Sequence, residues 1–164
     1  YGIGAFSLAK DIGVSNKEAK HYIESYLAHY SGVDSYMKNV VEKANADGYV
    51  ETMFGRRRNL PELTSSKHMI RAFGERVARN MPIQGTAADI IKIAMIKVDE
   101  RMKAENLRAR LVLQVHDELI VEAPQDESMR VALIVQEEME NAVKMSVPLT
   151  ADAAIGRTWY DAKG

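Results

Sequence analysis

The sequence of 164 residues contains no cysteine, which excludes a disulfide framework and a zinc site built on cysteine ligands. It also lacks any run of about 18 or more apolar residues, so it predicts no membrane-spanning helix. No signal-peptide pattern opens the chain. With 46% hydrophobic residues, the chain can bury one ordinary core. These features predict a soluble domain and are compatible with a reducing cytoplasm.

The net charge of −1 shows little excess of either sign, yet the basic residues are unevenly distributed. Residues 50–80 carry seven Lys and Arg against three Asp and Glu, whereas residues 81–164 carry ten against fourteen. A basic segment of this kind is either a solvated surface or a face that binds nucleic acid. Composition alone does not choose between the two.

Local capping signals predict helices in the first half of the chain. Ala5–Ile12 is followed by Gly13, a residue typical of the position after a helix. Ser15 and Glu18 have the spacing of a capping box, which starts a second helix. The expected elements are a helix over 5–12, a second from 16 to about 31, a third from about 33 to 47, a strand over 49–52 and a basic loop over 55–63.

Three tyrosines, Tyr22, Tyr26 and Tyr30, recur at helical spacing on the second of these helices. Such a stripe marks one face of a helix. It is more typical of packing than of base stacking, so we expect these rings to pack.

In the second half the apolar spacing changes from helical to strand-like and back. The expected elements are a helix from about 67 to 105, strands over 111–115 and 119–121, a helix over 124–143 and a closing strand over 147–155. Pro82 lies inside the first of these helices, where it removes a backbone donor and crowds the preceding turn, so we expect a kink or a restart. The order of elements predicts an α+β fold with a helix packed on one face of an antiparallel sheet.

His116, Asp117 and Glu118 separate the two central strands. This arrangement predicts a tight hairpin with two carboxylates at its tip. Adjacent carboxylates repel one another, and a divalent cation gives a reason for them because hard cations prefer carboxylate oxygen. The alternative is a turn whose charged residues are simply solvated.

The segment Gln114-Val115-His116-Asp117-Glu118, between two apolar strands, resembles motif C of the family A DNA polymerases, the bacterial polymerase I group. Other segments resemble the same family in the same order. They are Tyr1-Gly2, Gly48–Thr52 with Gly55–Arg58 and Leu60-Pro61, Glu75-Arg76 with Asn80 and Pro82–Asp89, and the ending Trp159–Lys163. The resemblance covers essentially the whole chain.

The resemblance implies a DNA-directed DNA polymerase that transfers nucleotides from dNTPs to a primer 3′-hydroxyl by a two-metal mechanism. The implied partners are primer–template DNA, a dNTP and the rest of the polymerase chain, in the bacterial cytoplasm and associated with the nucleoid. Residues 1–80 would form the rear of the helical fingers, and residues 81–164 the C-terminal part of the palm. Because the chain starts at Tyr1 and not at Met, we expect a fragment of a longer protein.

In this family the carboxylates of motif C bind Mg²⁺, so the resemblance assigns catalysis and metal binding to Asp117 and, as the weaker candidate, Glu118. Two Mg²⁺ ions, one partly ligated by a residue missing from this chain, would align the reactants and neutralise the developing charge. His116 would lie near the terminal sugar of the primer. A lone histidine is otherwise more often a structural hydrogen-bonding residue.

Arg76, Asn80 and Gln84 are spaced by four, which places them on one helical face if Pro82 does not turn the chain away. The resemblance places this trio against the DNA minor groove, whose acceptors are shared by all base pairs. Without the resemblance, three exposed polar residues on a surface helix are the simpler interpretation.

Two further groups of DNA contacts are expected. Arg56, Arg57 and Arg58 follow Gly55, and guanidinium groups bind phosphate in a bidentate manner, so we expect contact with the template backbone. Tyr1 resembles the tyrosine that ends the fingers helix, where it stacks near the templating position and the incoming nucleotide. That role rests entirely on the resemblance.

The sequence lacks the family's Lys and Arg that bind the triphosphate and its second metal-binding Asp, all of which would precede Tyr1. We therefore expect the fragment alone to be inactive. One rival interpretation is a non-catalytic DNA-binding module. Another is a metal hydrolase using His116, Asp117 and Glu118, which is disfavoured because three consecutive residues of a strand do not converge on one ion.

Overall fold

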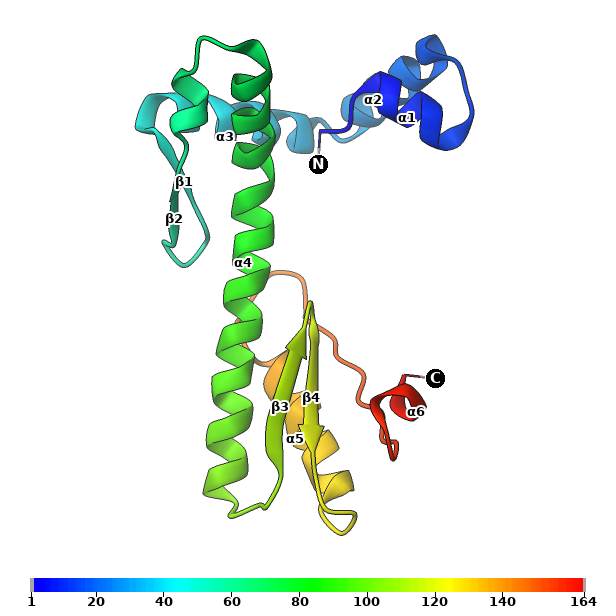
Figure 1. The fold of residues 1–164 in the computed structure, drawn as a ribbon, viewed down its shortest axis with the longest axis vertical. Helices are drawn as coiled ribbons and strands as arrows, with labels where there is room; N and C mark the ends of the chain where they lie inside the picture. Colours follow the sequence, from blue (N-terminus) through cyan, green and yellow to red (C-terminus); the bar gives the residue numbers. More distant parts are fainter. Residues whose placement is uncertain (1, 164) are drawn as a thin grey trace. The chain divides into compact units, whose positions relative to one another are not determined.

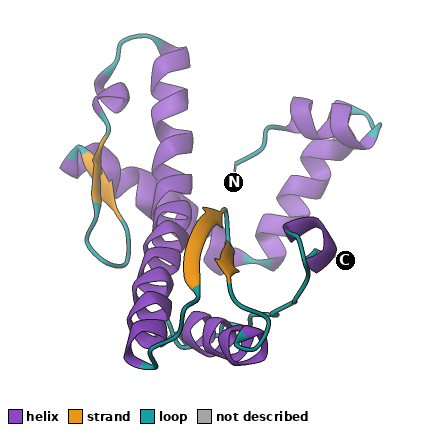
Figure 2. Ribbon diagram, turned by 60° about the horizontal axis from the view of Figure 1, so that its bottom comes forward, coloured by secondary structure: helices purple, strands orange, loops and turns teal. Residues whose placement is uncertain are grey.

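The computed structural model describes residues 2–163, which group into two compact units. The first unit ends at Thr86 and the second begins at Ala87. Helices dominate both units, and each contains one small antiparallel sheet of two strands (Figure 2). The predicted α+β class is confirmed. Among residues 2–163, no helix combines the length and apolarity needed to cross a membrane.

The helix ends of the first unit follow the predicted caps. Helix α1 (Ala5–Ile12) ends at Gly13, whose φ of 70° is left-handed. Helix α2 (Asn16–His29) begins at a capping box: the Glu18 amide donates to Ser15 Oγ at 3.2 Å, and the Ser15 amide donates to the Glu18 carboxylate at 3.0 Å. Helix α3 (Ser31–Asp47) follows almost directly and ends at Gly48, with φ of 76°. These predictions are confirmed because the caps depend only on near neighbours.

The expected packing of Tyr22, Tyr26 and Tyr30 is wrong for the described chain. Their side chains are 50%, 55% and 50% exposed. The buried residue of α2 is Ala19, which precedes Tyr26 by about two helical turns and so lies on the same side of the helix. Tyr26 and Tyr30 contact each other, with ring centroids 4.9 Å apart. Helical spacing identified a shared face, but it carries no information about what covers that face.

The expected basic loop contains a strand. Strand β1 (Tyr49–Glu51) pairs in antiparallel fashion with β2 (Arg57–Asn59), and the connecting turn uses Gly55 at a φ of 77°. A short 3₁₀ helix, η1 (Pro61–Thr64), follows. The hairpin packs over a core made by α3, η1 and the next helix; its buried residues are Ala44, Val50, Leu60, Leu63 and Ala78.

Helix α4 (His68–Ala104) has 37 residues and passes through Pro82 without ending, so the predicted restart is wrong (Figure 1). Proline removes one backbone donor from a helix, whereas the turns on either side keep theirs. The side chain of Thr86 also donates to the Pro82 carbonyl at 2.5 Å. Residues on both sides of Pro82 therefore belong to one helix.

The second unit is built on the predicted hairpin. Strand β3 (Arg110–Val115) pairs in antiparallel fashion with β4 (Glu118–Glu122), and helix α5 (Ser128–Glu140) follows. Figure 1 shows α5 behind the hairpin, and a common core joins it to α4 and the strands. The buried residues of this core are Val98, Met102, Ala109, Val131 and Ile134.

The predicted closing strand over residues 147–155 is wrong. This segment has no regular secondary structure, and the chain instead ends in a short helix, α6 (Trp159–Ala162). A strand requires a neighbour to hydrogen-bond with, and Pro148 removes one of the necessary donors. No strand in the part of the chain that the structure describes pairs with this segment.

Candidate functional site

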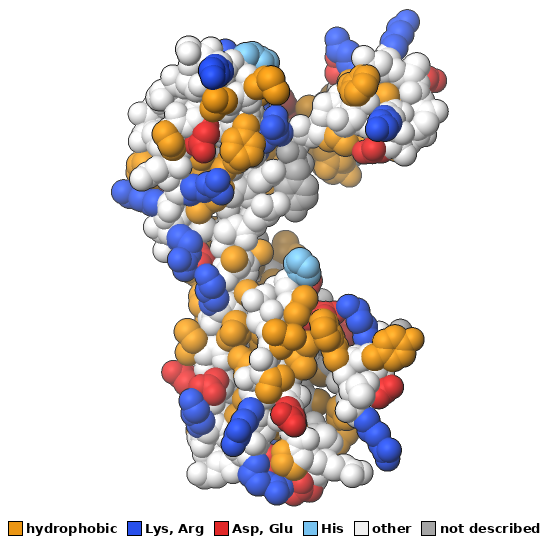
Figure 3. All heavy atoms as spheres, viewed as in Figure 1, with side chains coloured by type: hydrophobic (Ala, Val, Ile, Leu, Met, Phe, Trp, Pro, Cys, Tyr) orange, Lys and Arg blue, Asp and Glu red, His pale blue; other side chains and the backbone are white. Residues whose placement is uncertain are grey.

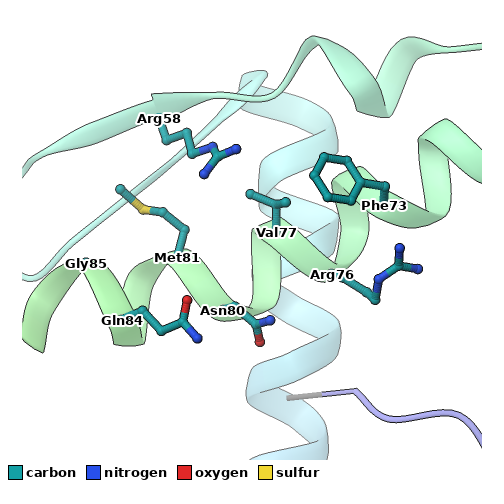
Figure 4. A pocket seen from close by; sticks show the side chains of 8 residues that line it. All are labelled: Arg58, Phe73, Arg76, Val77, Asn80, Met81, Gln84 and Gly85. Carbon is teal, nitrogen blue, oxygen red and sulfur yellow. The ribbon is translucent and has the colours of Figure 1, made fainter. Parts of the chain in front are cut away.

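The continuous helix α4 presents Arg76, Asn80 and Gln84 along one face, as their spacing predicts. All three line a single pocket in the first unit, together with Arg58 from β2 (Figure 4). The other lining residues are Phe73, Val77, Met81 and Gly85. The structure therefore brings the predicted trio together with one of the three predicted arginines.

Arg58 lies beside α4 because the β1–β2 hairpin packs against this helix. The Met53 amide donates to Thr86 Oγ1 at 3.0 Å. A Cβ placed on Gly85 would lie only 2.7 Å from Thr52 Cγ2, so the backbone of α4 approaches the hairpin closely at this glycine. The hairpin and α4 thus form the walls of the pocket.

The three arginines of the hairpin have different surroundings. Arg57 Nε donates to Glu51 Oε2 at 3.2 Å, and its guanidinium lies 4.4 Å from the centre of the Tyr49 ring. The Arg56 amide donates to Thr52 Oγ1 at 3.2 Å inside the turn. Arg58 is the one that lines the pocket. The arginines therefore do not form one uniform basic surface.

The polar groups of the pocket are suited to donating to and accepting from a partner. Arg76 is exposed and its guanidinium lies 5.9 Å from the centre of the Phe73 ring. Asn80 Oδ1 is buried and has no hydrogen-bond partner within the described residues. A buried acceptor without a partner is unfavourable by about 1–3 kcal/mol, which is relieved when a ligand or water donates to it.

The apolar wall of the pocket escaped the sequence analysis, although its signal was present. Phe73, Val77, Met81 and Gly85 are spaced by four, like the polar trio, and are offset from it by one or three residues. On a helix, two such rows run side by side. The proximity of Arg58 had no local signal because it depends on the pairing of β1 with β2.

The second predicted site is the turn between β3 and β4. Val115 pairs with Glu118, so His116 and Asp117 form a two-residue connection, and His116 has a φ of 53°. The Gln114 side-chain amide donates to the His116 carbonyl at 2.6 Å. Asp117 is exposed at the tip, and within residues 2–163 no hydrogen bond or ion pair engages its carboxylate.

Glu118 has a different environment from its neighbour. It is the first residue of β4, and its side chain is 42% exposed. Its Oε1 lies 3.6 Å from the Nζ of Lys163, which also lies 5.5 Å from the centre of the Trp159 ring. In the sequence, Lys163 stands out only as a member of the C-terminal segment that resembles the family. No nearby sequence signal connects this lysine to the hairpin.

The donors of the turn fit part of a site for a hard divalent cation. Asp117 offers an exposed, unpaired carboxylate, and carboxylate oxygen is the ligand type that Mg²⁺ prefers. Residues 2–163 bring together no group of three or more His, Cys, Asp or Glu that could hold an ion.

An ion-pair network supports the hairpin from behind by joining α4 to α5. Arg101 lies 2.7 Å from carboxylate oxygens of both Glu137 and Glu138, and Glu105 pairs with Arg101 and Arg130. The hydrogen bond that Arg130 donates to Glu105 lowers the pKa of Glu105. The hydrogen bonds that Arg101 donates to Glu138 and, with a smaller effect, to Glu137 raise the pKa of Arg101. Both shifts favour the charged forms of Glu105 and Arg101.

Tyr1, the remaining predicted site residue, lies outside the described residues. The roles predicted for the other residues also stay predictions, because proximity and exposure show where side chains lie and not what they bind.

Comparison with known proteins places the chain in a family. It is 53% identical over 163 residues to DNA polymerase I of Bacillus caldotenax and 50% identical to that of Bacillus subtilis, covering 99% of this chain but only 19% and 18% of those proteins. A solved structure, the POL domain of Pol1 from M. smegmatis in complex with DNA primer-template and dNTP, shares 46% identity and a TM-score of 0.95. That alignment covers 100% of this chain and 29% of the other.

The chain thus spans about a fifth of the length of the curated relatives that it matches. The family profile matches nearly all of it, over residues 1–161. The chain belongs to DNA polymerase family A.

Proposed function

We propose that the chain forms part of the polymerase domain of a DNA-directed DNA polymerase, which transfers nucleotides from dNTPs to a primer 3′-hydroxyl as directed by a template. The observation that carries this proposal is the pocket that combines Arg58 of β2 with Arg76, Asn80 and Gln84 of α4. Membership of family A and similarity to a polymerase domain bound to primer-template DNA and dNTP support it. In this proposal residues 1–80 belong to the fingers and residues 81–164 to the palm.

The α4 pocket would hold the minor groove of the primer–template duplex. Arg76 and Gln84 donate to the acceptors that every base pair presents there, so binding is independent of sequence. Asn80 lines the same pocket between Arg76 and Gln84, so it would lie beside the same groove. Arg58, with Arg56 and Arg57 on the same hairpin, would contact phosphate, which positions the duplex without reading it.

The hairpin tip would serve the chemistry of the reaction. Asp117 would bind a divalent cation directly, with Glu118 beside it and His116 near the primer terminus. Two Mg²⁺ ions, when bound, neutralise the charge that develops during phosphoryl transfer. The task of Asp117 is to supply one fixed carboxylate, and the remaining ligands would come from outside this chain. Tyr1 would contact the templating base and the incoming nucleotide.

A second candidate function, DNA binding without catalysis, applies to the chain in isolation. The observation that favours it is the absence, within residues 2–163, of a cluster of three metal-binding side chains.

The bacterial relatives and the proposed DNA partner support a location in the bacterial cytoplasm, at the nucleoid.

The test is primer extension by the full-length polymerase that contains this chain. Asp117→Ala should lower the rate of nucleotide incorporation by several orders of magnitude, because the loss of a metal ligand removes several kcal/mol of transition-state stabilisation. Primer–template binding should change little, and Glu118→Ala should lower the rate less. The matched control is Asp152→Ala, an exposed aspartate of the same unit. Near-normal turnover by the Asp117 variant would remove the assignment.

A further inference from the structure

We propose that Lys163 is a positioning residue that holds Glu118 away from the metal ligand Asp117 and thereby weakens divalent-cation binding at the hairpin tip. This inference rests on the proposed function, because it assumes that Asp117 binds the cation. The observation behind it is the ion pair between Glu118 Oε1 and Lys163 Nζ, at 3.6 Å. It links the catalytic hairpin to the last helix of the chain.

The placement of Lys163 is built into the last turn of the chain. The Asp161 amide donates to Thr158 Oγ1 at 3.2 Å, while the Thr158 amide donates to the Asp161 carboxylate at 3.1 Å, so α6 begins at a complete capping box. The chain before the helix passes close to its end. A Cβ on Gly156 would lie 2.5 Å from the Ala162 nitrogen, an approach that only glycine permits.

Lys163 is held between two groups at the end of this turn. Its Nζ faces the Glu118 carboxylate on one side and lies 5.5 Å from the centre of the Trp159 ring on the other, within the range of a cation–π contact. The Lys163 side chain is 64% exposed, so the pair is a surface pair and its strength is modest. The ion pair matters because of its position, since its carboxylate belongs to Glu118, the residue that follows Asp117.

Two consequences follow for a cation at the tip. First, Asp117 and Glu118 are neighbours that differ in their partners: Lys163 engages Glu118, whereas Asp117 has no partner within the described residues. Asp117 is therefore free to coordinate, and Glu118 has to leave Lys163 before it can do so. Second, the positive charge of Lys163 repels a divalent cation near the turn. Both effects weaken cation binding and leave Asp117 as the main ligand.

The experiment uses the full-length polymerase without DNA or nucleotide and measures the binding of Mn²⁺ from the signal of free Mn²⁺ in electron paramagnetic resonance. Lys163→Met should tighten Mn²⁺ binding about two- to fivefold, the range that corresponds to a surface ion pair. Lys163→Arg, which keeps the charge, should restore the original affinity. Lys144→Met is the control, since this lysine is exposed in the same unit. The magnesium concentration that half-saturates primer extension should shift in parallel with Mn²⁺ binding.

The role of Glu118 is tested by repeating the substitution in the Glu118→Gln background, where Lys163→Met should tighten Mn²⁺ binding less than in the parent, because only the direct charge repulsion is then removed. Unchanged or weaker Mn²⁺ binding by Lys163→Met, or a shift of full size in the Glu118→Gln background, would overturn the inference. Failure of the proposed function gives a different result, because then Asp117→Ala would leave Mn²⁺ binding and primer extension unaltered. Since Lys163 is exposed, these variants are expected to fold, which circular dichroism verifies.

Discussion

At the scale of single residues, Arg76, Asn80 and Gln84 share a helical face but differ in surroundings. Arg76 and Gln84 are exposed, whereas Asn80 is half-buried and keeps its buried Oδ1 without a partner. The spacing of four was sufficient to predict that the trio is aligned. The place of Arg58 in the same pocket was not predictable, because Arg58 lies on strand β2, a segment that we expected to be a loop.

The exposed guanidinium of Arg76 makes it the residue whose removal is easiest to interpret. Arg76→Ala should weaken primer–template binding roughly five- to tenfold, on the order of 1 kcal/mol, and equally for different DNA sequences. Fluorescence anisotropy with several duplexes at two salt concentrations measures this. The salt dependence should flatten if Arg76 contacts phosphate and stay the same if it contacts only base edges. Lys10→Ala serves as the control on the same unit, and an unaltered Kd for Arg76→Ala would return it to a solvated surface.

At the scale of elements, predictions succeeded where the cause is local. The end of α1 at Gly13, the start of α2 at Ser15 and the end of α3 at Gly48 each depend on a few neighbouring residues. The sequence did not predict strand β2, because Arg57–Asn59 has no alternating apolar pattern and becomes a strand only by pairing with β1. The prediction of a strand over residues 147–155 was wrong for the opposite reason. The pattern of this segment resembles a strand, but no strand of the described chain pairs with it.

The contact between the β1–β2 hairpin and α4 predicts the effect of Gly85→Ala. Alanine favours a helix over glycine by about 0.5–1 kcal/mol, but overpacking typically destabilises by about 1–3 kcal/mol. Thr52 is buried and its Oγ1 accepts from the amides of Phe54 and Arg56 at 3.2 Å, so it has little room to move. We therefore expect overpacking to dominate, with a net loss of roughly 1–2 kcal/mol.

Thermal unfolding of the chain measures this change, and Gly32→Ala provides the matched comparison. Gly32 also lies in a helix, but a Cβ there meets no heavy atom within 4 Å. That variant should be neutral or slightly stabilising. A stability gain of the same size in both variants would show that the close approach at Gly85 has no energetic consequence.

The ion pairs between α4 and α5 predict how stability depends on pH. The hydrogen bond from Arg130 lowers the pKa of Glu105 from its ordinary value of 4.5. A lowered folded-state pKa contributes stability at pH values above 4.5, and that contribution disappears as the pH falls through the folded-state pKa. Glu105→Gln should therefore destabilise the chain at pH 7, and the difference from the parent should shrink below pH 4.5.

Urea unfolding at a series of pH values measures that difference. Glu100→Gln, at an exposed glutamate of α4 five residues before Glu105, is the control and should leave the urea midpoint nearly unchanged at every pH. A Glu105→Gln deficit that stays constant into strongly acidic solution would contradict the assignment of this ion pair.

At the scale of the whole molecule, the chain contains the pocket that we propose contacts DNA and one end of the proposed metal site. It spans about a fifth of its curated relatives, and its described residues form no complete metal cluster. We therefore expect the 164-residue chain alone to show no primer extension with Mg²⁺, primer–template and dNTPs, because neither charge neutralisation nor alignment is complete. Extension by the purified chain that is lost in Asp117→Ala would overturn this expectation.

The isolated chain should also self-associate. Its β3–β4 sheet has two strands, so each strand has an unpaired edge, and Val112 and Leu113 are 52% and 47% exposed. Figure 3 shows hydrophobic side chains gathered on the viewed face over this hairpin. Unpaired edges with apolar side chains favour association between chains. Analytical ultracentrifugation should show concentration-dependent oligomers, and a strictly monomeric chain at high concentration would contradict this expectation.

The account depends above all on Asp117 as the carboxylate that binds the catalytic cation. The most direct test is the anomalous scattering of Mn²⁺ in crystals of the full-length polymerase with primer–template DNA and an incoming nucleotide. We predict an anomalous peak within bonding distance of the Asp117 carboxylate, with Glu118 still facing Lys163. Well-occupied Mn²⁺ peaks beside the nucleotide, none of them in contact with Asp117, would contradict the account.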